Sequence, residues 1–137
     1  MKITFKNGYT IHLVSQIVGA IVWYAIKGSL TWLPIVLVAT IASYVVLFRL
    51  MTDIDRRKLL VSARVILGMN IVSIGLGFII FYFSDTIGSL MLSVGIYFNY
   101  GFYALLTMNL PNVLRMTLMI LLSPMLLYIG SVINQNK

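Results

Sequence analysis

The sequence predicts an all-α integral membrane protein, a compact bundle of about five transmembrane helices. Three observations lead to this fold class. Hydrophobic residues make up 61% of the 137-residue chain, charged residues make up only 9%, and the charged residues fall in tails, loops and segment ends. A soluble domain of this size could not bury so much apolar surface. The whole chain, residues 1–137, is therefore expected to form one polytopic transmembrane domain.

Five apolar stretches are long enough to cross about 30 Å of hydrocarbon, which requires roughly 17–25 helical residues. Helices are expected because an open strand in lipid would leave its backbone groups unpaired. The predicted spans are residues 9–26, 30–48, 65–83, 87–107 and 113–133, and a basic cytoplasmic loop is predicted at residues 49–64.

The first predicted span contains the polar residues His12, Ser15 and Gln16. If this segment lay at the membrane interface, the bundle would have four spans. Residues 2–11 also alternate around Asn7-Gly8, a pattern typical of a β-hairpin. An isolated hairpin is only marginally stable, however, and a helix is the favoured interpretation.

The residues between the spans are typical of turns and helix ends. Lys27-Gly28-Ser29 predicts a tight turn, and Pro34 suits the start of the second helix. Ser84-Asp85 can cap the fourth helix, and Asn109-Leu110-Pro111-Asn112 predicts a turn followed by an N-cap.

Positive charge predicts the orientation. With the N-terminus inside, eight of the ten Lys and Arg residues lie on the inner side, and only Lys27 and Lys137 lie outside. This bias predicts an N-inside, C-outside topology. The small size, short loops and charge bias favour a bacterial cytoplasmic (inner) membrane.

The net charge of +7 also follows from this topology and implies no nucleic-acid partner. The basic residues are expected to contact the anionic heads of membrane lipids at the cytoplasmic side. Those of the predicted loop are Arg49, Arg56, Arg57, Lys58 and Arg64.

Few side chains could carry chemistry, because the chain has no Cys, no Glu and a single His. Asp53 and Asp55 superficially match a metal-binding acidic pair. We favour a structural role, in which Thr52 or Asp53 caps a helix and the Asp residues form ion pairs with Arg57 and Lys58. No catalytic, cofactor-binding or metal-binding residue is therefore expected, and acid–base catalysis is disfavoured.

Four residues are candidates for interhelical bonds or a cavity, since amides in lipid need a polar partner. Gln16, Asn70 and Asn99 lie within predicted spans, and Pro124 is expected to kink the fifth. Small residues at four-residue spacing predict close helix packing at the pairs Ser15/Gly19, Ala39/Ser43, Ser73/Gly77 and Ser89/Ser93.

The aromatic run at residues 97–103 is compatible with either simple packing or binding of a flat apolar ligand or lipid. We expect the protein to act through helix contacts as an accessory, assembly or protective (immunity-type) subunit. Its partner would be another membrane protein or a second copy. One alternative is a passive transporter or channel for a neutral or lipid-like solute. Another is a membrane enzyme with an inner-rim site at Asp53 and Asp55.

Overall fold

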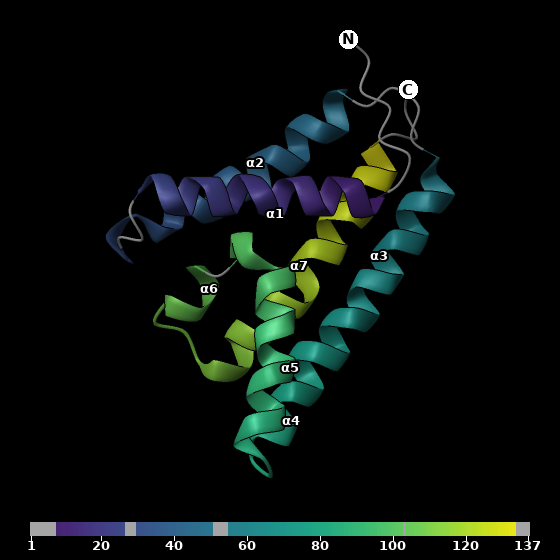
Figure 1. Cartoon of the computed structure of the whole chain (residues 1–137). Coiled ribbons are helices and arrows are strands. Elements are labelled where there is room, and N and C mark those ends of the chain that lie inside the picture. Colours follow the sequence, from purple (N-terminus) through teal and green to yellow (C-terminus); the bar gives the residue numbers. More distant parts are fainter. Residues whose placement is uncertain (1–7, 27–29, 51–54, 103, 134–137) are drawn as a thin grey trace.

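The computed structural model describes residues 8–26, 30–50, 55–102 and 104–133. Within these ranges the chain is 91% helical and has no strands, which confirms the all-α prediction (Figure 1). The elements are α1 (Gly8–Ala25), the 3₁₀ turn η1 (Leu30–Trp32), α2 (Leu33–Leu50), α3 (Arg56–Asn70), the π-helical segment η2 (Ile71–Leu76), α4 (Gly77–Phe81), α5 (Asp85–Phe98), the 3₁₀ turn η3 (Tyr100–Phe102), α6 (Ala104–Thr107) and α7 (Asn112–Ile133).

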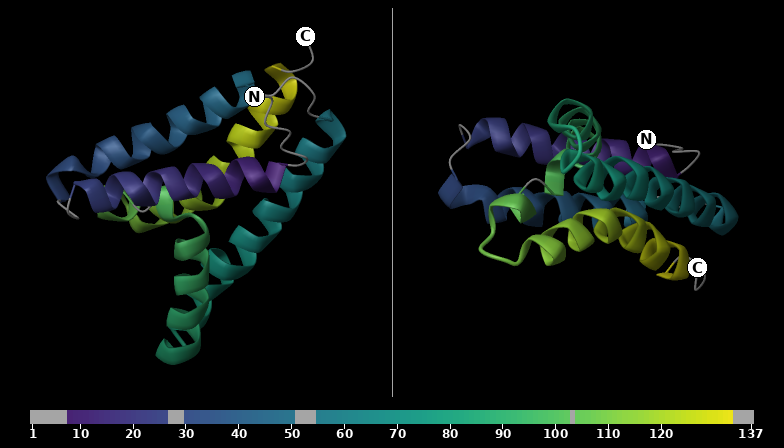
Figure 2. Two further views of the ribbon diagram at one scale, coloured as in Figure 1. Left: turned by 45° about the horizontal axis from the view of Figure 1, so that its top comes forward. Right: turned by 90° about the horizontal axis from the view of Figure 1, so that it is seen from below.

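The helices form two pairs and a projecting hairpin. α1 packs along α2, and α3 packs along α7 in the opposite direction (Figure 1). The chain continues from α3 through η2 and α4, and α5 then returns along them. The left view of Figure 2 shows this hairpin extending away from the layer that α1 and α2 form. The two pairs and the base of the hairpin meet in the interior, where the buried side chains gather.

Three helices in the described part of the chain are long and apolar enough to span a membrane. They are α2, the continuous helix Arg56–Phe81, and α7. α5 is apolar but has only 14 residues. α1 has 18 residues, several of them polar, and is not among the three. The membrane prediction is thus supported for three helices, and five spans remain a prediction.

The third helix begins nine residues before the predicted span at 65–83 and a few residues after the predicted cap at Thr52 or Asp53. α3 starts at Arg56, so residues 56–64 of the predicted cytoplasmic loop are helical. Asp55 is the N-cap, and its side chain accepts from the N–H of Arg57 at 2.9 Å. Arg, Lys and Leu are good helix formers, and this cap lets a charged segment join the apolar helix. Thr52 and Asp53, the predicted caps, lie outside the described residues.

The fourth predicted span, 87–107, is not one helix, because α5 ends at Phe98 and is followed by the 3₁₀ turn η3 and the four-residue helix α6. Its start was predicted correctly: Ser84 caps α5 and accepts from the N–H of Ile87 at 3.5 Å. The other boundaries agree closely with α1, α2 and α7. Gly8–Ile11 is helical, so the hairpin alternative is wrong for these residues, whereas residues 2–7 lie outside the described ranges.

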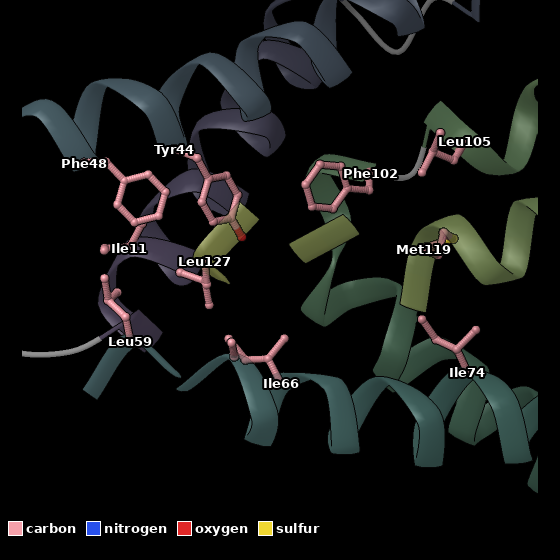
Figure 3. Packing of buried hydrophobic residues seen from close by; sticks show 11 residues of the cluster. Ile11, Tyr44, Phe48, Leu59, Ile66, Ile74, Phe102, Leu105, Met119 and Leu127 are labelled. Atoms are coloured by element: carbon pink, nitrogen blue, oxygen red, sulfur yellow. The ribbon is translucent and has the colours of Figure 1, made fainter. Parts of the chain in front are cut away.

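The hydrophobic core joins all the long helices. Figure 3 shows Tyr44, Phe48 and Leu59 with Leu127 at one end, and Phe102, Ile74 and Met119 at the other. These side chains come from α2, α3, η2, η3 and α7. The outer faces carry many exposed apolar side chains, among them Phe83 and Val113. Such large exposed apolar surfaces are expected of a protein whose surroundings are lipid.

Candidate functional site

The predicted fourth span is interrupted at Asn99, in the interior of the molecule. Asn99 follows the last residue of α5 and has φ −116° and ψ 36°, outside the helical range. The N–H of Phe102 then donates to the carbonyl of Asn99 at 2.9 Å. A continuous helix would have used the Phe98 carbonyl for this bond. The break therefore leaves buried backbone groups that need other partners.

His12 of α1 binds the freed carbonyl of Phe98. Its Nε2 lies 3.1 Å from that oxygen, and its Nδ1 lies 2.6 Å from the hydroxyl of Tyr44 on α2. Because a carbonyl oxygen only accepts, Nε2 must carry a proton, and in the neutral ring Nδ1 accepts from Tyr44. The His12 side chain is buried. It thus ties α1 and α2 to the end of α5.

Gln16 and Thr40 bind the backbone of Gly101 in the same break. The N–H of Gly101 donates to Gln16 Oε1 at 2.7 Å. The Thr40 hydroxyl lies 3.2 Å from the Gly101 carbonyl and 2.7 Å from the Val36 carbonyl of its own helix. Gln16 Nε2 also donates to the Tyr44 hydroxyl at 3.4 Å. Polar side chains of α1 and α2 thus replace the helical bonds that the fourth span lacks.

The side chain of Asn99 connects the break to two more helices. Its Nδ2 donates to Asn70 Oδ1 at 2.8 Å and to the Gly95 carbonyl at 3.0 Å. Its Oδ1 accepts from the Ser123 hydroxyl of α7 at 2.8 Å. Asn70, Asn99 and Ser123 are fully buried. The amide is therefore fixed in orientation, because the Gly95 carbonyl can only accept.

Pro124 explains the remaining bond of Asn70. Proline has no backbone N–H, so the carbonyl four residues earlier, that of Ile120, loses its usual helical donor. Asn70 Nδ2 donates to this carbonyl at 3.0 Å. Pro124 thus leaves the Ile120 carbonyl without a helical donor, and the Asn70 amide of the facing helix supplies one.

Three departures from α-helix therefore meet at one place. They are the break at Asn99, Pro124 in α7, and the π-helical segment η2, which starts directly after Asn70. Local π-helix within α-helices is frequent at functional sites. The buried polar residues that meet here form what we call the central polar cluster: His12, Gln16, Thr40, Tyr44, Asn70, Asn99 and Ser123.

Sequence analysis identified part of this cluster. It selected Gln16, Asn70, Asn99 and Pro124, and the structure brings them together. For His12 the favoured prediction is a hydrogen bond to Gln16 or to a neighbouring span, and its bonds to Tyr44 and to the Phe98 carbonyl agree with the second possibility. Thr40, Tyr44 and Ser123 were not predicted. One pattern could have revealed two of these: Thr40 and Tyr44 are four residues apart on the second segment, as His12 and Gln16 are on the first, so each pair shares a helix face.

The predicted small-residue pairs have different environments. A β carbon at Gly19 would lie 2.5 Å from the α carbon of Gly101, and one at Gly77 would lie 3.1 Å from the N of Leu92. These glycines allow close helix approach. Their partners Ser15 and Ser73 are buried and half-buried, and Ala39 and Ser43 are half-buried.

Ser89 and Ser93 do not lie at the packed face of α5. Both are exposed, and the Ser93 hydroxyl bonds to the Ser89 carbonyl within the helix. Gly88 and Gly95 make the close contacts instead, with Phe81 and Ile74. Residues 88 and 95 are two turns apart and share one face, whereas residues 89 and 93 are rotated away from it.

The basic residues expected at lipid heads lie at helix ends and on α3. Arg49 is in the last turn of α2, and Arg56, Arg57, Lys58 and Arg64 follow one another on α3. All five are exposed. This placement is compatible with contact to lipid heads.

The acidic residues that the structure describes lie outside the central polar cluster. No group of three or more His, Cys, Asp or Glu residues that could hold a metal ion is found in the part of the chain that the structure describes. Asp55 and Asp85 both lie at helix N-termini, and Asp53 is outside the described residues. The groups of the central polar cluster bond to one another and to backbone, which is the arrangement of a structural network.

Apolar grooves open on the outside of the bundle, one of them between α1 and α5 and another between α3 and α7. The α1–α5 groove encloses about 620 Å³ and includes Gln16, Tyr24, Tyr97, Phe98 and Tyr100 in its lining. The rings of Tyr97 and Tyr100 stack, with centroids 6.4 Å apart. Part of the predicted aromatic run thus lines a groove, whereas Phe102 is fully buried in the core.

Comparison with protein families, with characterised proteins and with solved structures found no match to this chain.

Proposed function

We propose that this chain is an integral membrane protein that acts through helix contacts with another membrane protein, as an accessory, assembly or protective (immunity-type) subunit. The observation that carries the proposal is the outward face of α5. This helix packs chiefly against α4 and η2, through Gly88 and Gly95. Its opposite flank has no helix in the described part of the chain against it over most of its length.

The outward face of α5 has the composition of a helix-docking surface. Ser89 and Ser93 are exposed and four residues apart, a spacing that lets a second helix approach closely in lipid. Leu90 and Val94 stand beside them and are 67% and 55% exposed. Small residues flanked by large apolar ones suit van der Waals packing of a transmembrane helix. The hairpin's projection from the bundle leaves this face open to such a partner (Figure 2).

The absence of Cys from the chain makes a direct test possible, because a single introduced thiol is unique. Ser93→Cys, labelled with a photoactivatable maleimide in the native membrane, should crosslink to one foreign membrane protein. Thr117→Cys on α7 is the matched control, since Thr117 is also exposed and also bonds to the carbonyl four residues before it. Equal crosslinking to lipid alone from both positions would contradict the proposal.

A passive carrier for a neutral or lipid-like solute is the second candidate, favoured by the broken fourth span. Broken helices surround the binding sites of many transporters. Here the polar groups at the break are bonded internally, so an apolar solute in the α1–α5 groove is the better fit. Asn99→Leu distinguishes the two functions: loss of transport with an intact complex indicates a carrier, whereas loss of assembly indicates the subunit.

We include in the proposal a bacterial cytoplasmic membrane and an N-inside orientation, which the distribution of Lys and Arg supports. The predicted C-outside end does not fit the structure, because α3 and α7 pack in opposite directions: if α3 starts at the cytoplasmic side, α7 ends there. With this orientation, the α2–α3 connection faces the cytoplasm and the tip of the α4–α5 hairpin faces outward.

A further inference from the structure

The α3–α7 groove combines an apolar floor with one cation. Leu60 and Leu67 of α3 and Leu121 and Met125 of α7 line it, and Arg64 and Tyr128 contribute polar groups. Its volume is about 280 Å³. A helix with side chains has a diameter of about 10–12 Å and would not enter such a narrow space, whereas part of one acyl chain would fit.

Arg64 has no anionic partner among the described residues. The nearest carboxylate along its helix is Asp55, nine residues away, which corresponds to about 13 Å of helix. That carboxylate already accepts from the N–H of Arg57. A guanidinium beside apolar side chains in a membrane requires a counter-ion or water. The groove therefore has a place for an anion next to a place for a hydrocarbon chain.

A second cation lies on the same side of α3. Arg57 precedes Arg64 by seven residues, two helical turns, and both are exposed. Leu67 lies one turn beyond Arg64 in the opposite direction, toward the apolar end of the helix. From Arg64 toward Leu67 the groove lining is apolar, so a head group at Arg64 and an acyl chain beyond it would follow one another as they do in a phospholipid.

We propose that the α3–α7 groove binds a phospholipid with an anionic head, its phosphate on Arg64 and one acyl chain between Leu67 and Leu121. Arginine suits this role because its planar donors match phosphate oxygens. The inference rests on the proposed membrane location but not on the proposed protein partner, so a failed search for the partner leaves it intact.

Native mass spectrometry of the purified full chain tests this site. The protein is given equal amounts of phosphatidylglycerol and phosphatidylcholine with identical acyl chains. We expect preferential retention of phosphatidylglycerol, and Arg64→Gln should weaken that binding about fivefold, the contribution of one cation near an anionic surface. Arg64→Lys should keep most of it. Arg49→Gln, an exposed arginine at the end of α2, is the matched control and should change binding less than about twofold.

Met125→Trp tests the chain-binding part independently, because residue 125 is 52% exposed and lines the groove. The larger side chain should reduce retention of both lipids. Circular dichroism and elution volume report whether each variant folds. The proposal is overturned if wild-type protein retains the two lipids equally, if Arg64→Gln and Arg49→Gln act alike, if Met125→Trp retains lipid like wild type, or if excess inorganic phosphate alone displaces the bound lipid.

Discussion

Asn70 and Pro124 show how one residue determines what another must do. Pro124 withholds a backbone N–H, and the Ile120 carbonyl accepts from Asn70 instead. Asn70 in turn accepts from Asn99. A buried acceptor without a donor costs about 1–3 kcal/mol. The proline and the amide therefore form a coupled pair, although they lie on different helices.

A double-mutant cycle on Asn70 and Pro124 measures this coupling. Asn70→Ala alone should lower the free energy of unfolding by ~1–2 kcal/mol, because it leaves the Ile120 carbonyl and the Asn99 amide short of partners. In a Pro124→Ala background the same substitution should cost less, by ~0.5–1 kcal/mol, since the alanine returns a backbone N–H to the Ile120 carbonyl. Unfolding by denaturant titration in mixed micelles measures each free energy, and strict additivity would argue against the bond.

The helices of this protein are irregular where they meet and regular elsewhere. The break at Asn99, the π-helical segment η2 and Pro124 all border the central polar cluster. Close approach at this point also depends on glycine. Gly19 of α1 lies against Thr40 of α2 and Gly101 of η3. These three elements can approach so closely because residue 19 has no side chain.

Gly19→Ala tests this convergence. A methyl group there would overlap the α carbon of Gly101, and we expect a loss of ~1–3 kcal/mol from overpacking. Gly68→Ala is the matched control, since no atom lies within 4 Å of an added β carbon on this helical glycine. It should leave stability unchanged or raise it by up to ~1 kcal/mol. Thermal unfolding in the same detergent compares them, and equal effects would contradict this packing.

The sequence allowed prediction of most helices, because long apolar stretches between Gly, Pro and charged residues leave few alternatives in lipid. It could not locate the break at Asn99. Residues 98–102 lie inside a longer, mostly apolar stretch, and the break depends on His12, Gln16 and Thr40, which are distant in sequence. The start of α3 was predicted to within a few residues from its cap, Thr52 or Asp53, whereas the observed cap is Asp55. The span boundary at residue 65 came from hydropathy, which marks only where the helix becomes apolar.

Considered as a whole, the molecule has a satisfied central polar cluster and a predominantly apolar exterior. Seven buried polar side chains hold α1, α2, α3, α7 and the broken segment together, and the α4–α5 hairpin extends from that centre (Figure 1). With these polar groups engaged internally, the protein offers its surroundings mostly apolar faces and shallow grooves. We therefore expect its specificity to reside in shape and helix contact within the membrane.

Native mass spectrometry of the tagged protein, extracted gently from its own membrane, tests this account most directly. We expect a stoichiometric complex with one foreign membrane protein. The double substitution Ser89→Leu and Ser93→Leu should release that partner while the chain stays folded. A lone homo-oligomer or monomer, unchanged by this double substitution, would contradict the proposed function.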